Sequence, residues 1–405
     1  MNKMKTPILA PKKEYCCGCG ACVNVCKTDA ITMKCDEYGF DYPVIDETKC
    51  VECGKCKDIC SYQSTHKDTQ NPVEAFAAVS KNTDVMNSAS GGVFASIATE
   101  FLKQGGVVAG AALESIDGSL VPHHITVDNL NDLQKLLGSK YVHSDTKDIF
   151  KEIKKLLCEN RKVLFSGTPC QVGALYSFLG EKYDNLFTID LICHGVPSRK
   201  MFSDYLDFIS DKYGRVKDFV FRDKKRGLTF VSRAVCEKNG KKSVKYIQYG
   251  ENAYYTFFLQ GNTYRDCCYE CKYASKDRTG DITIGDFWGI KAQHPELFDG
   301  GHKEFDAQKG ISCLLENTEK GNELINTYGT GLSLYQSTFE KIALENKQLS
   351  EPSVPKGNRA EIMEIYKSNG YSALDRYFKN QAGITFYTAK LKAKTPLWVK
   401  KILKK

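Results

Sequence analysis

The spacing of apolar residues changes along the chain, and each change predicts a different kind of element. Residues 75–79 and 107–113 are short apolar runs that predict strands, and the longer pattern of residues 93–103 predicts a helix between them. A loop of small residues at 88–92 opens that helix. A strand, a helix and a second strand in this order are typical of a sheet covered by helices.

The same order recurs further along the chain. The predicted elements are a strand at 162–166, a loop at 167–171, a helix that ends at Leu179, a strand at 186–192, a loop at 193–198 and a helix at 199–210 capped by Ser198. Right-handed crossovers make such strands parallel. Cys170 and Cys193 are therefore expected together at the carboxyl edge of one sheet, where open α/β sheets bind their ligands.

The net charge of +8 is concentrated at one end of the chain. Residues 386–405 contain seven lysines and no acidic residue, so the rest of the chain carries a net charge of only +1. A nucleic-acid-binding protein normally has a broad basic face. We therefore expect no nucleic-acid partner.

Eighteen cysteines are the most informative feature of the composition. No uncharged apolar run is long enough for a membrane-spanning helix, and residues 1–11 lack the apolar core of a secretory signal. We therefore expect a cytoplasmic protein. In that compartment, cysteines serve metal or redox chemistry more often than disulfides.

Eight cysteines near the start of the chain form two copies of the motif C-x2-C-x2-C-x3-C. The copies are Cys16, Cys19, Cys22 and Cys26, and Cys50, Cys53, Cys56 and Cys60. Three thiolates at this spacing bind three irons of one 4Fe–4S cube, and the fourth reaches the other cube. The ligand sets expected are Cys16, Cys19, Cys22 and Cys60 for one cluster, and Cys50, Cys53, Cys56 and Cys26 for the second.

Residues 14–62 resemble the bacterial two-cluster ferredoxins. One departure is that Lys27 and Ser61 replace the proline that follows each fourth cysteine in that family. A zinc module is the alternative, but zinc sites separate two pairs of ligands by a longer loop. Cys17 and Cys35 fall outside the motif and are expected to be free thiols.

Four cysteines in the rest of the chain are candidates for a third cluster. Cys170 and Cys193 follow predicted strands, and Cys268 and Cys271 precede a strand predicted at 281–284. If that strand joins the same sheet, the four thiols surround a third cubane. The alternative is that Cys170 and Cys193 are small buried apolar residues, and spacing alone leaves both interpretations open.

Six short motifs resemble the coenzyme F420 hydrogenase/dehydrogenase beta-subunit family. They are SASGG at 88–92, SKYV at 139–142, GTPCQ at 167–171, CHGVPS at 193–198, CYEC at 268–271 and GDFWG at 285–289. The resemblance implies a non-covalent FAD and a 4Fe–4S cluster on the four cysteines of the main domain. In members with this N-terminal segment it implies two further clusters.

The resemblance also draws attention to a segment suited to a flavin pyrophosphate. Its candidate residues are Ser88, Ser90, Gly91 and Gly92. Unpaired N–H groups where a helix begins bind phosphates well. The chain has no G-x-G-x-x-G sequence, so this is not the Rossmann fingerprint, and an ordinary helix start is the alternative.

Further candidates lie beside the cysteines of the main domain. Lys140 could neutralise a phosphate or the reduced flavin, and Thr168, Gln171 and Gly195 are expected to touch the flavin. His194 could move the proton that accompanies a hydride. The alternative for His194 is a hydrogen bond to a cluster sulfide.

Together these residues predict an FAD- and 4Fe–4S-dependent oxidoreductase. A cluster carries one electron and FAD carries one or two, so the combination connects a one-electron carrier such as ferredoxin to a small organic substrate, F420-like or other. The alternatives are an electron-transfer subunit of a larger hydrogenase or dehydrogenase complex, and a regulator that senses its clusters. The sequence does not specify the substrate.

The predicted fold is α/β with four parts. They are a ferredoxin-like α+β module at 1–62, an FAD-binding part at 73–160, a part at 161–330 with the third cluster and the flavin or substrate site, and a helical extension at 331–405. Polar residues 63–72 are the expected linker. In the extension, helices are expected at 359–368 and 371–379. The lysine-rich end, residues 390–405, could contact an anionic membrane or a partner, with a solvated tail as the alternative.

Overall fold

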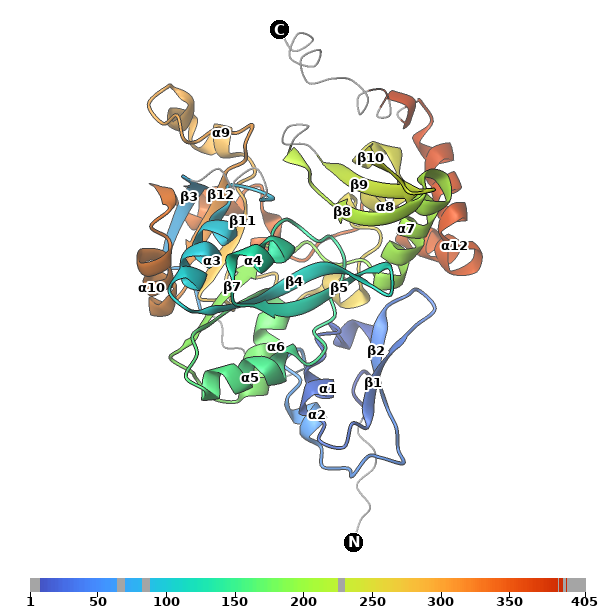
Figure 1. The fold of residues 1–405 in the computed structure, drawn as a ribbon, viewed down its shortest axis with the longest axis horizontal. Helices are drawn as coiled ribbons and strands as arrows, with labels where there is room; N and C mark the ends of the chain where they lie inside the picture. Colours follow the sequence, from blue (N-terminus) through green and yellow to red (C-terminus); the bar gives the residue numbers. More distant parts are fainter. Residues whose placement is uncertain are drawn as a thin grey trace.

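The computed structural model describes residues 8–63, 70–81, 88–224, 230–384, 386–388 and 391. The described residues form a small N-terminal module, a large mixed sheet with helices on both faces, and a smaller antiparallel sheet with its own helices (Figure 1). The sequence thus predicted the α/β class and the separate N-terminal module correctly.

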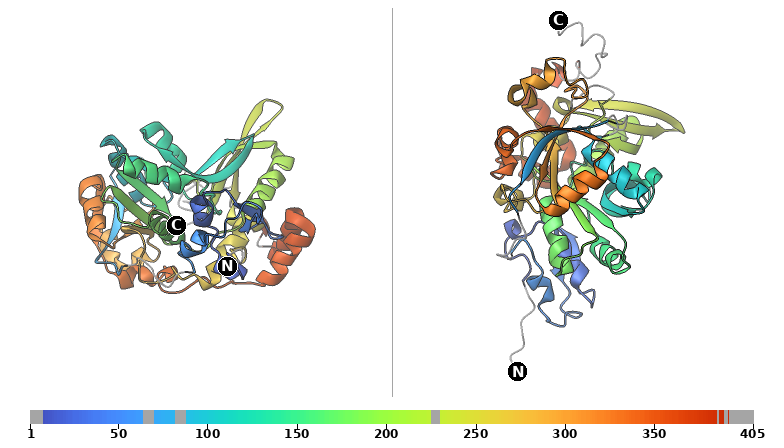
Figure 2. Two further views of the ribbon diagram at one scale, coloured as in Figure 1. Left: turned by 90° about the horizontal axis from the view of Figure 1, so that it is seen from below. Right: turned by 90° about the vertical axis from the view of Figure 1, so that its left-hand side faces the viewer.

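The N-terminal module is an antiparallel hairpin with two short helices beside it. Its elements are η1 (Lys13–Tyr15), α1 (Ala21–Val25), β1 (Ile31–Cys35), β2 (Asp41–Ile45) and α2 (Lys55–Asp58). Ile31 pairs with Ile45 in the hairpin, and α1 contacts α2. The module also contacts α5 and α6 of the main domain through α1, so it does not stand alone (Figure 2).

The large sheet has eight strands in the order β13-β3-β12-β11-β7-β6-β4-β5. Their bounds are β3 (Glu74–Ser80), β4 (Val107–Ile116), β5 (Ser119–Val127), β6 (Val163–Gly167), β7 (Leu186–Leu191), β11 (Ile282–Asp286), β12 (Ser312–Glu316) and β13 (Leu332–Gln336). The four central strands β4, β6, β7 and β11 are parallel, as predicted, and antiparallel strands extend the sheet on both sides.

Helices cover both faces of this sheet because neighbouring strand residues point to opposite sides. On one face, α3 (Val93–Lys103), α4 (Leu130–Leu136) and α10 (Glu319–Tyr328) pack on Val108 and Leu164. On the other face, α5 (Ile149–Cys158) and α6 (Pro169–Leu179) pack on Ala109 and Phe165. The parallel strands are therefore buried on both sides, which agrees with their continuous apolar sequences.

The smaller sheet was not predicted. It consists of β8 (Arg215–Val220), β9 (Val231–Lys238) and β10 (Lys241–Gln248), covered by α7 (Arg199–Tyr213), α8 (Ala253–Leu259) and α12 (Arg359–Ala382). Aromatic side chains dominate this second core, where the rings of Tyr205 and Tyr254 stack with their centroids 5.0 Å apart. Helix α12 is interrupted at Gly370, between the two helices that the sequence predicted.

The remaining described elements are short and connect the larger ones. They are η4 (Tyr249–Glu251), η5 (Asp266–Glu270), α9 (Ile290–Gln293), η6 (Pro295–Phe298), α11 (Phe339–Ala343) and η7 (Lys347–Leu349). Among the described residues, no helix has both the length and the apolar character needed to cross a membrane.

Several predicted boundaries are correct, and two need correction. The helix at 93–103 is confirmed with both ends, and Ser198 caps α7 by accepting the N–H of Met201 at 3.2 Å. The loop predicted at 167–171 is shorter, because Pro169 already begins α6 and fits its first turn. The segment after residue 330 begins with strand β13 at the sheet edge, before any helix.

The lysine-rich end and the expected linker fall partly outside the described residues. Residues 390 and 392–405 of the lysine-rich end lie outside the described residues, as do 64–69 of the expected linker. Gln70, at the end of that linker, exchanges two backbone hydrogen bonds with Arg278, each 2.8 Å long. This bridge fixes the chain to the main domain just before β3.

Candidate functional site

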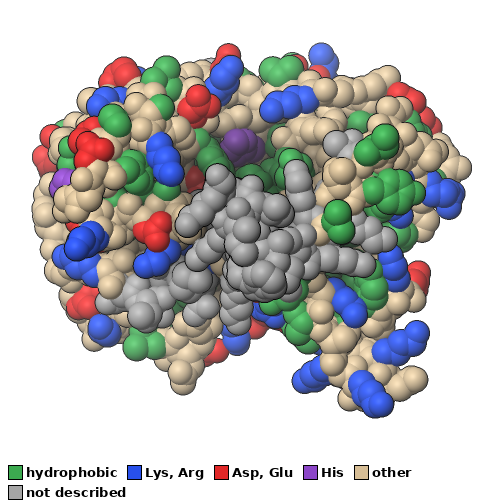
Figure 3. Space-filling model, turned by 90° about the horizontal axis from the view of Figure 1, so that it is seen from above, with side chains coloured by type: hydrophobic (Ala, Val, Ile, Leu, Met, Phe, Trp, Pro, Cys, Tyr) green, Lys and Arg blue, Asp and Glu red, His purple; other side chains and the backbone are tan. Residues whose placement is uncertain are grey.

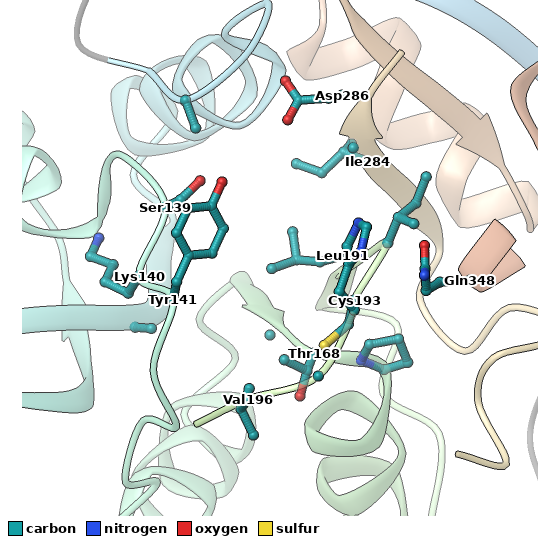
Figure 4. A pocket seen from close by; sticks show the side chains of 18 of the residues that line it. Ser139, Lys140, Tyr141, Thr168, Leu191, Cys193, Val196, Ile284, Asp286 and Gln348 are labelled. Atoms are coloured by element: carbon teal, nitrogen blue, oxygen red, sulfur yellow. The ribbon is translucent and has the colours of Figure 1, made fainter. Parts of the chain in front are cut away.

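A cavity of about 580 Å³ opens at the carboxyl ends of β6, β7 and β11. Cavities of about 300 to 1,000 Å³ commonly hold small ligands and cofactors. Seen from above, the molecule is hollowed here, with apolar side chains and a histidine in the wall (Figure 3). Around the cavity, Figure 4 shows Ser139 and Tyr141 on one side, with Cys193 and Asp286 on other elements.

The first predicted cysteine group comes together in the N-terminal module. Its members are Cys16, Cys19, Cys22 and Cys60. Burial raises the pKa of the Cys22 thiol, and the other three sulfurs of the group raise it further. Four neighbouring thiols can all lose their protons only if cations nearby compensate the negative charges. The irons of a cluster would supply this positive charge.

The second predicted group is closer to solvent. Burial raises the pKa of Cys56, and the neighbouring thiols of Cys53 and Cys26 raise it further. Cys53 is exposed, whereas Cys56 is buried. The fourth member, Cys50, accepts the N–H of Glu52 at 3.4 Å. We call these four the outer group and the first set the inner group.

The four predicted cysteines of the main domain also come together, and we call them the core group. Burial raises the pKa of Cys193, and the thiols of Cys268, Cys170 and Cys271 raise it further. Burial also raises the pKa of Cys271, which together with the effect of the Cys170 and Cys268 thiols reaches about 12. All four line the cavity, so the core group borders the space where a cofactor could bind.

The arrangement of the thiols is compatible with cubane clusters. All eighteen cysteines lie in the described residues and carry free thiols. Within the described part of the chain, no three His, Cys, Asp or Glu side chains converge on a point that could hold one metal ion. A cubane does not need such convergence, because each of its four thiolates binds a different iron.

The serine–glycine segment lies at the cavity, with one exception among its predicted residues. Ser88, Ser90 and Gly92 line the cavity where α3 begins, and Gly92 places no capping side chain over the helix N–H groups. Gly91 does not line it: a Cβ there would lie 2.3 Å from the backbone oxygen of Ala78. Gly91 is thus needed for close packing on β3, and its contact with a ligand stays a prediction.

Three more predicted flavin contacts line the cavity, but their polar atoms already have protein partners. The Lys140 ammonium donates to the backbone oxygen of Leu137 at 2.8 Å, and burial lowers the pKa of Lys140 to about 7. The Gln171 carboxamide oxygen accepts from the Thr168 backbone N–H at 3.0 Å, which forms the capping box of α6. Thr168 and Gln171 therefore shape the start of α6 beside Cys170.

His194 and Gly195 form the cavity wall directly after Cys193. The His194 side chain is exposed to the cavity, and the surrounding protein lowers its pKa while the Asp286 carboxylate partly opposes this. Gly195 has a φ of +132°, and a Cβ there would lie 2.4 Å from the Tyr264 ring. Only glycine fits at this position, which keeps the loop close to the aromatic wall.

Comparisons with known proteins agree with this arrangement. Residues 160–337 match the family described as the C terminus of the coenzyme F420 hydrogenase/dehydrogenase beta subunit. Residues 15–64 match the 4Fe-4S dicluster domain. The chain therefore joins a segment similar to a dicluster domain to a segment similar to the C-terminal part of these beta subunits. These matches confirm the family resemblance expected from the short motifs.

Two individual proteins are also similar to this chain. "Uncharacterized protein MJ1349" of Methanocaldococcus jannaschii is 27% identical over 199 residues, which cover 42% of this chain and 54% of that protein. The chain thus spans about half the length of this curated relative. The second is a chain of the F420-reducing NiFe hydrogenase complex from Methanosarcina barkeri, solved as a xenon derivative. It superposes with a TM-score of 0.45 and is 16% identical in sequence. The superposition covers 70% of this chain and 90% of that chain.

A buried ion pair at the cavity of the beta-subunit domain was not predicted. Arg222 on the chain after β8 binds the Asp286 carboxylate at 2.5 Å, and its guanidinium lies 5.3 Å from the centroid of the Phe230 ring. Lys224 contacts the backbone oxygen of Ser90, and burial lowers its pKa to about 7. Both cations come from the smaller sheet, which the sequence did not indicate.

Two more residues at the boundary between the domains were missed. Cys17 is buried and packs in one cluster with Cys19 and Cys170, and these two thiols raise the pKa of Cys17. Arg265 is fully buried and reaches the inner group. The signal for Cys17 was present as an adjacent cysteine pair with Cys16, but for Arg265 no sequence signal existed.

Proposed function

We propose that this chain is an iron–sulfur flavoprotein oxidoreductase that passes electrons between a one-electron carrier and a small organic substrate. The outer, inner and core groups would each hold a 4Fe–4S cluster, and the cavity would hold FAD. Clusters exchange single electrons and a flavin exchanges one or two, so together they connect the two kinds of chemistry.

The observation that carries the proposal is the Cys17 thiol, which contacts both the inner and the core group. Cys17 packs against Cys19, a ligand candidate of the inner group, and against Cys170, a ligand candidate of the core group, which supports the proposal. The core group in turn lines the cavity. Cys22 of the inner group packs in one cluster with Cys26 and Cys56 of the outer group. These contacts support a series of three clusters that runs from the exposed Cys53 to the cavity wall.

The residues of the cavity fit a flavin in chemistry. The start of α3 offers N–H groups without a capping side chain, which suits a pyrophosphate. Aromatic and apolar side chains including Tyr141 and Leu191 line the space for a planar ring. His194, open to the cavity, is our candidate to hold the proton that accompanies a hydride.

An anaerobic reductive titration of the purified chain tests this proposal. We expect an uptake of about five electrons per chain, one for each cluster and two for the flavin, with flavin absorption near about 450 nm. In Cys170→Ala we expect iron to fall from about twelve to about eight atoms and the uptake to about four electrons.

Cys158→Ala is the matched control, because Cys158 is an exposed cysteine at the end of α5, outside the three groups. It should behave like the wild type. An uptake of about three electrons without flavin absorption would instead support an electron-transfer subunit with no substrate chemistry of its own. An unchanged iron count in Cys170→Ala would remove Cys170 from the ligands.

A further inference from the structure

Arg265 occupies an unusual position between the N-terminal module and the beta-subunit domain. Its side chain is 0% exposed. Its Nε donates to the backbone oxygen of Cys16 at 2.6 Å, and one terminal nitrogen donates to the backbone oxygen of Asp41 at 2.7 Å. The same nitrogen lies 3.6 Å from the Cys16 sulfur. Arg265 therefore extends from the main domain into the inner group.

The other terminal nitrogen of Arg265 has no hydrogen-bond partner although it is buried. A Cβ on Gly18 would lie 3.0 Å from it. Gly18 belongs to the loop between Cys16 and Cys19, the first two ligand candidates of the inner group. The unpaired N–H groups are thus directed at the loop that would wrap the inner cluster.

Arg265 also lacks the counterion that a buried arginine requires. Arg278, which is buried to a similar degree, forms an ion pair with Asp190 at 2.9 Å. Among the described residues, no carboxylate forms an ion pair with Arg265, and the adjacent Asp266 pairs with Arg359 instead. Burying an unpaired charge is very unfavourable, so an anionic group is needed at this place.

The surroundings of Arg265 supply sulfur in place of carboxylate. The sulfur of Cys16, 3.6 Å from a terminal guanidinium nitrogen, is such a group. The face of the guanidinium lies 4.1 Å from the centroid of the Tyr42 ring, which fixes its orientation. A cubane with four thiolates is anionic, and reduction adds one electron to it.

We propose that Arg265 is a positioning residue that stabilises the reduced form of the cluster on Cys16, Cys19, Cys22 and Cys60 and so raises its reduction potential. This inference rests on the proposed function, since it requires that cluster. Reduction adds one electron to the cluster, and the guanidinium keeps its proton throughout. The attraction between them therefore increases by one charge upon reduction, which favours the reduced form.

Redox titration monitored by electron paramagnetic resonance tests the inference on the anaerobically purified full chain. We expect Arg265→Gln to keep about twelve irons and to lower one of the three midpoint potentials by at least the equivalent of a tenfold change, about 59 mV for one electron. Arg265→Lys keeps the charge and should lower it less. Arg233→Gln is the matched control, because Arg233 pairs with Asp218 and Asp223 on the smaller sheet.

The outcomes separate the inference from the function on which it rests. A wild type without iron contradicts the proposed function. A wild type with full iron and an Arg265→Gln variant with unchanged potentials overturns only the role of Arg265.

If Arg265→Gln does not hold its clusters, a second measurement tests the inference. The wild type is labelled with ¹⁵N-arginine, reduced, and measured by pulsed electron paramagnetic resonance. A nitrogen coupling to a reduced cluster supports the inference, and its absence overturns it.

Discussion

At the residue scale, the loop after β7 depends on a glycine that no other residue can replace. Gly195 has a φ of +132°, which disfavours any residue with a side chain. In addition, a Cβ at this position would lie 2.4 Å from the Tyr264 ring. The backbone oxygen of the preceding His194 accepts the Ser353 hydroxyl at 2.6 Å, so the loop is held from both sides. The positions of Cys193 and His194 therefore depend on this close contact.

Gly195→Ala should move this loop and destabilise the protein by about 3 kcal/mol, because it adds backbone strain and overpacks the aromatic wall. Gly180→Ala is the control: Gly180 also has a positive φ, +71°, but no atom lies within 4 Å of a Cβ there. We expect the control to cost about 1 kcal/mol. Thermal unfolding and the iron content of both variants check this, and equal losses would contradict it.

Single residues also explain what could and could not be predicted from the sequence. The cysteine groups were predictable because ligand spacing is local in the motif and parallel strands bring their carboxyl ends together. Arg265 was not, because its importance arises from contacts with Cys16 and Asp41, far away in the chain. The close packing of Gly91 on β3 was not predicted, because a glycine needed for close packing and a glycine needed for ligand binding look alike in sequence.

At the scale of elements, helix ends and buried strands were the predictable part. The helix α3 has a strongly apolar face and starts after glycines, so both of its ends were predicted. The smaller sheet was missed because β8 and β10 mix charged with apolar residues and contain only two buried residues between them, Val216 and Phe219. The stability of the sheet comes from packing on α7 and α12. Such tertiary packing overrides the local pattern.

Strand β5 carries a buried histidine that makes stability depend on pH. His124 is 4% exposed, bonds the Ser144 hydroxyl at 3.1 Å through Nδ1, and leaves Nε2 without a partner. Burial lowers the pKa of His124 to about 4. When the pH falls below the unfolded pKa of about 6.5, only the unfolded chain takes up the proton, so stability is lost between these two values.

His124→Gln should remove this part of the pH dependence. Between about pH 7.5 and about pH 5.5, the free energy of unfolding of the wild type should fall by about 1 kcal/mol more than that of the variant. His302→Gln is a suitable control because the His302 side chain is 40% exposed. Denaturant unfolding at both pH values measures the free energies. An equal fall in the free energy of unfolding for all three proteins would contradict the assignment of this pH dependence to His124.

At the scale of the whole molecule, the order of the cysteine groups suggests where a carrier docks. The outer group contains the exposed Cys53, and the lysines beside it are exposed as well: Lys27, Lys49, Lys55 and Lys57. The inner and core groups lie deeper, between the module and the sheet. A small carrier with an acidic surface would therefore meet the outer group first.

Replacing Lys55 and Lys57 with glutamine should slow electron transfer from an acidic one-electron carrier such as ferredoxin by about tenfold at low salt. The effect should shrink as ionic strength rises, because salt screens exposed charges. Lys241→Gln with Lys242→Gln on the smaller sheet removes the same charge and should have little effect. Stopped-flow reduction measures the rates, and equal slowing by both pairs would argue against docking at the outer group.

We propose that the outer, inner and core groups of four cysteines each hold a 4Fe–4S cluster. Mössbauer spectroscopy of the full chain, prepared anaerobically with ⁵⁷Fe and combined with iron and sulfide analysis, measures this. We expect about twelve irons and about twelve sulfides per chain, all in cubane clusters. Zinc in place of iron, or iron without matching sulfide, would contradict it.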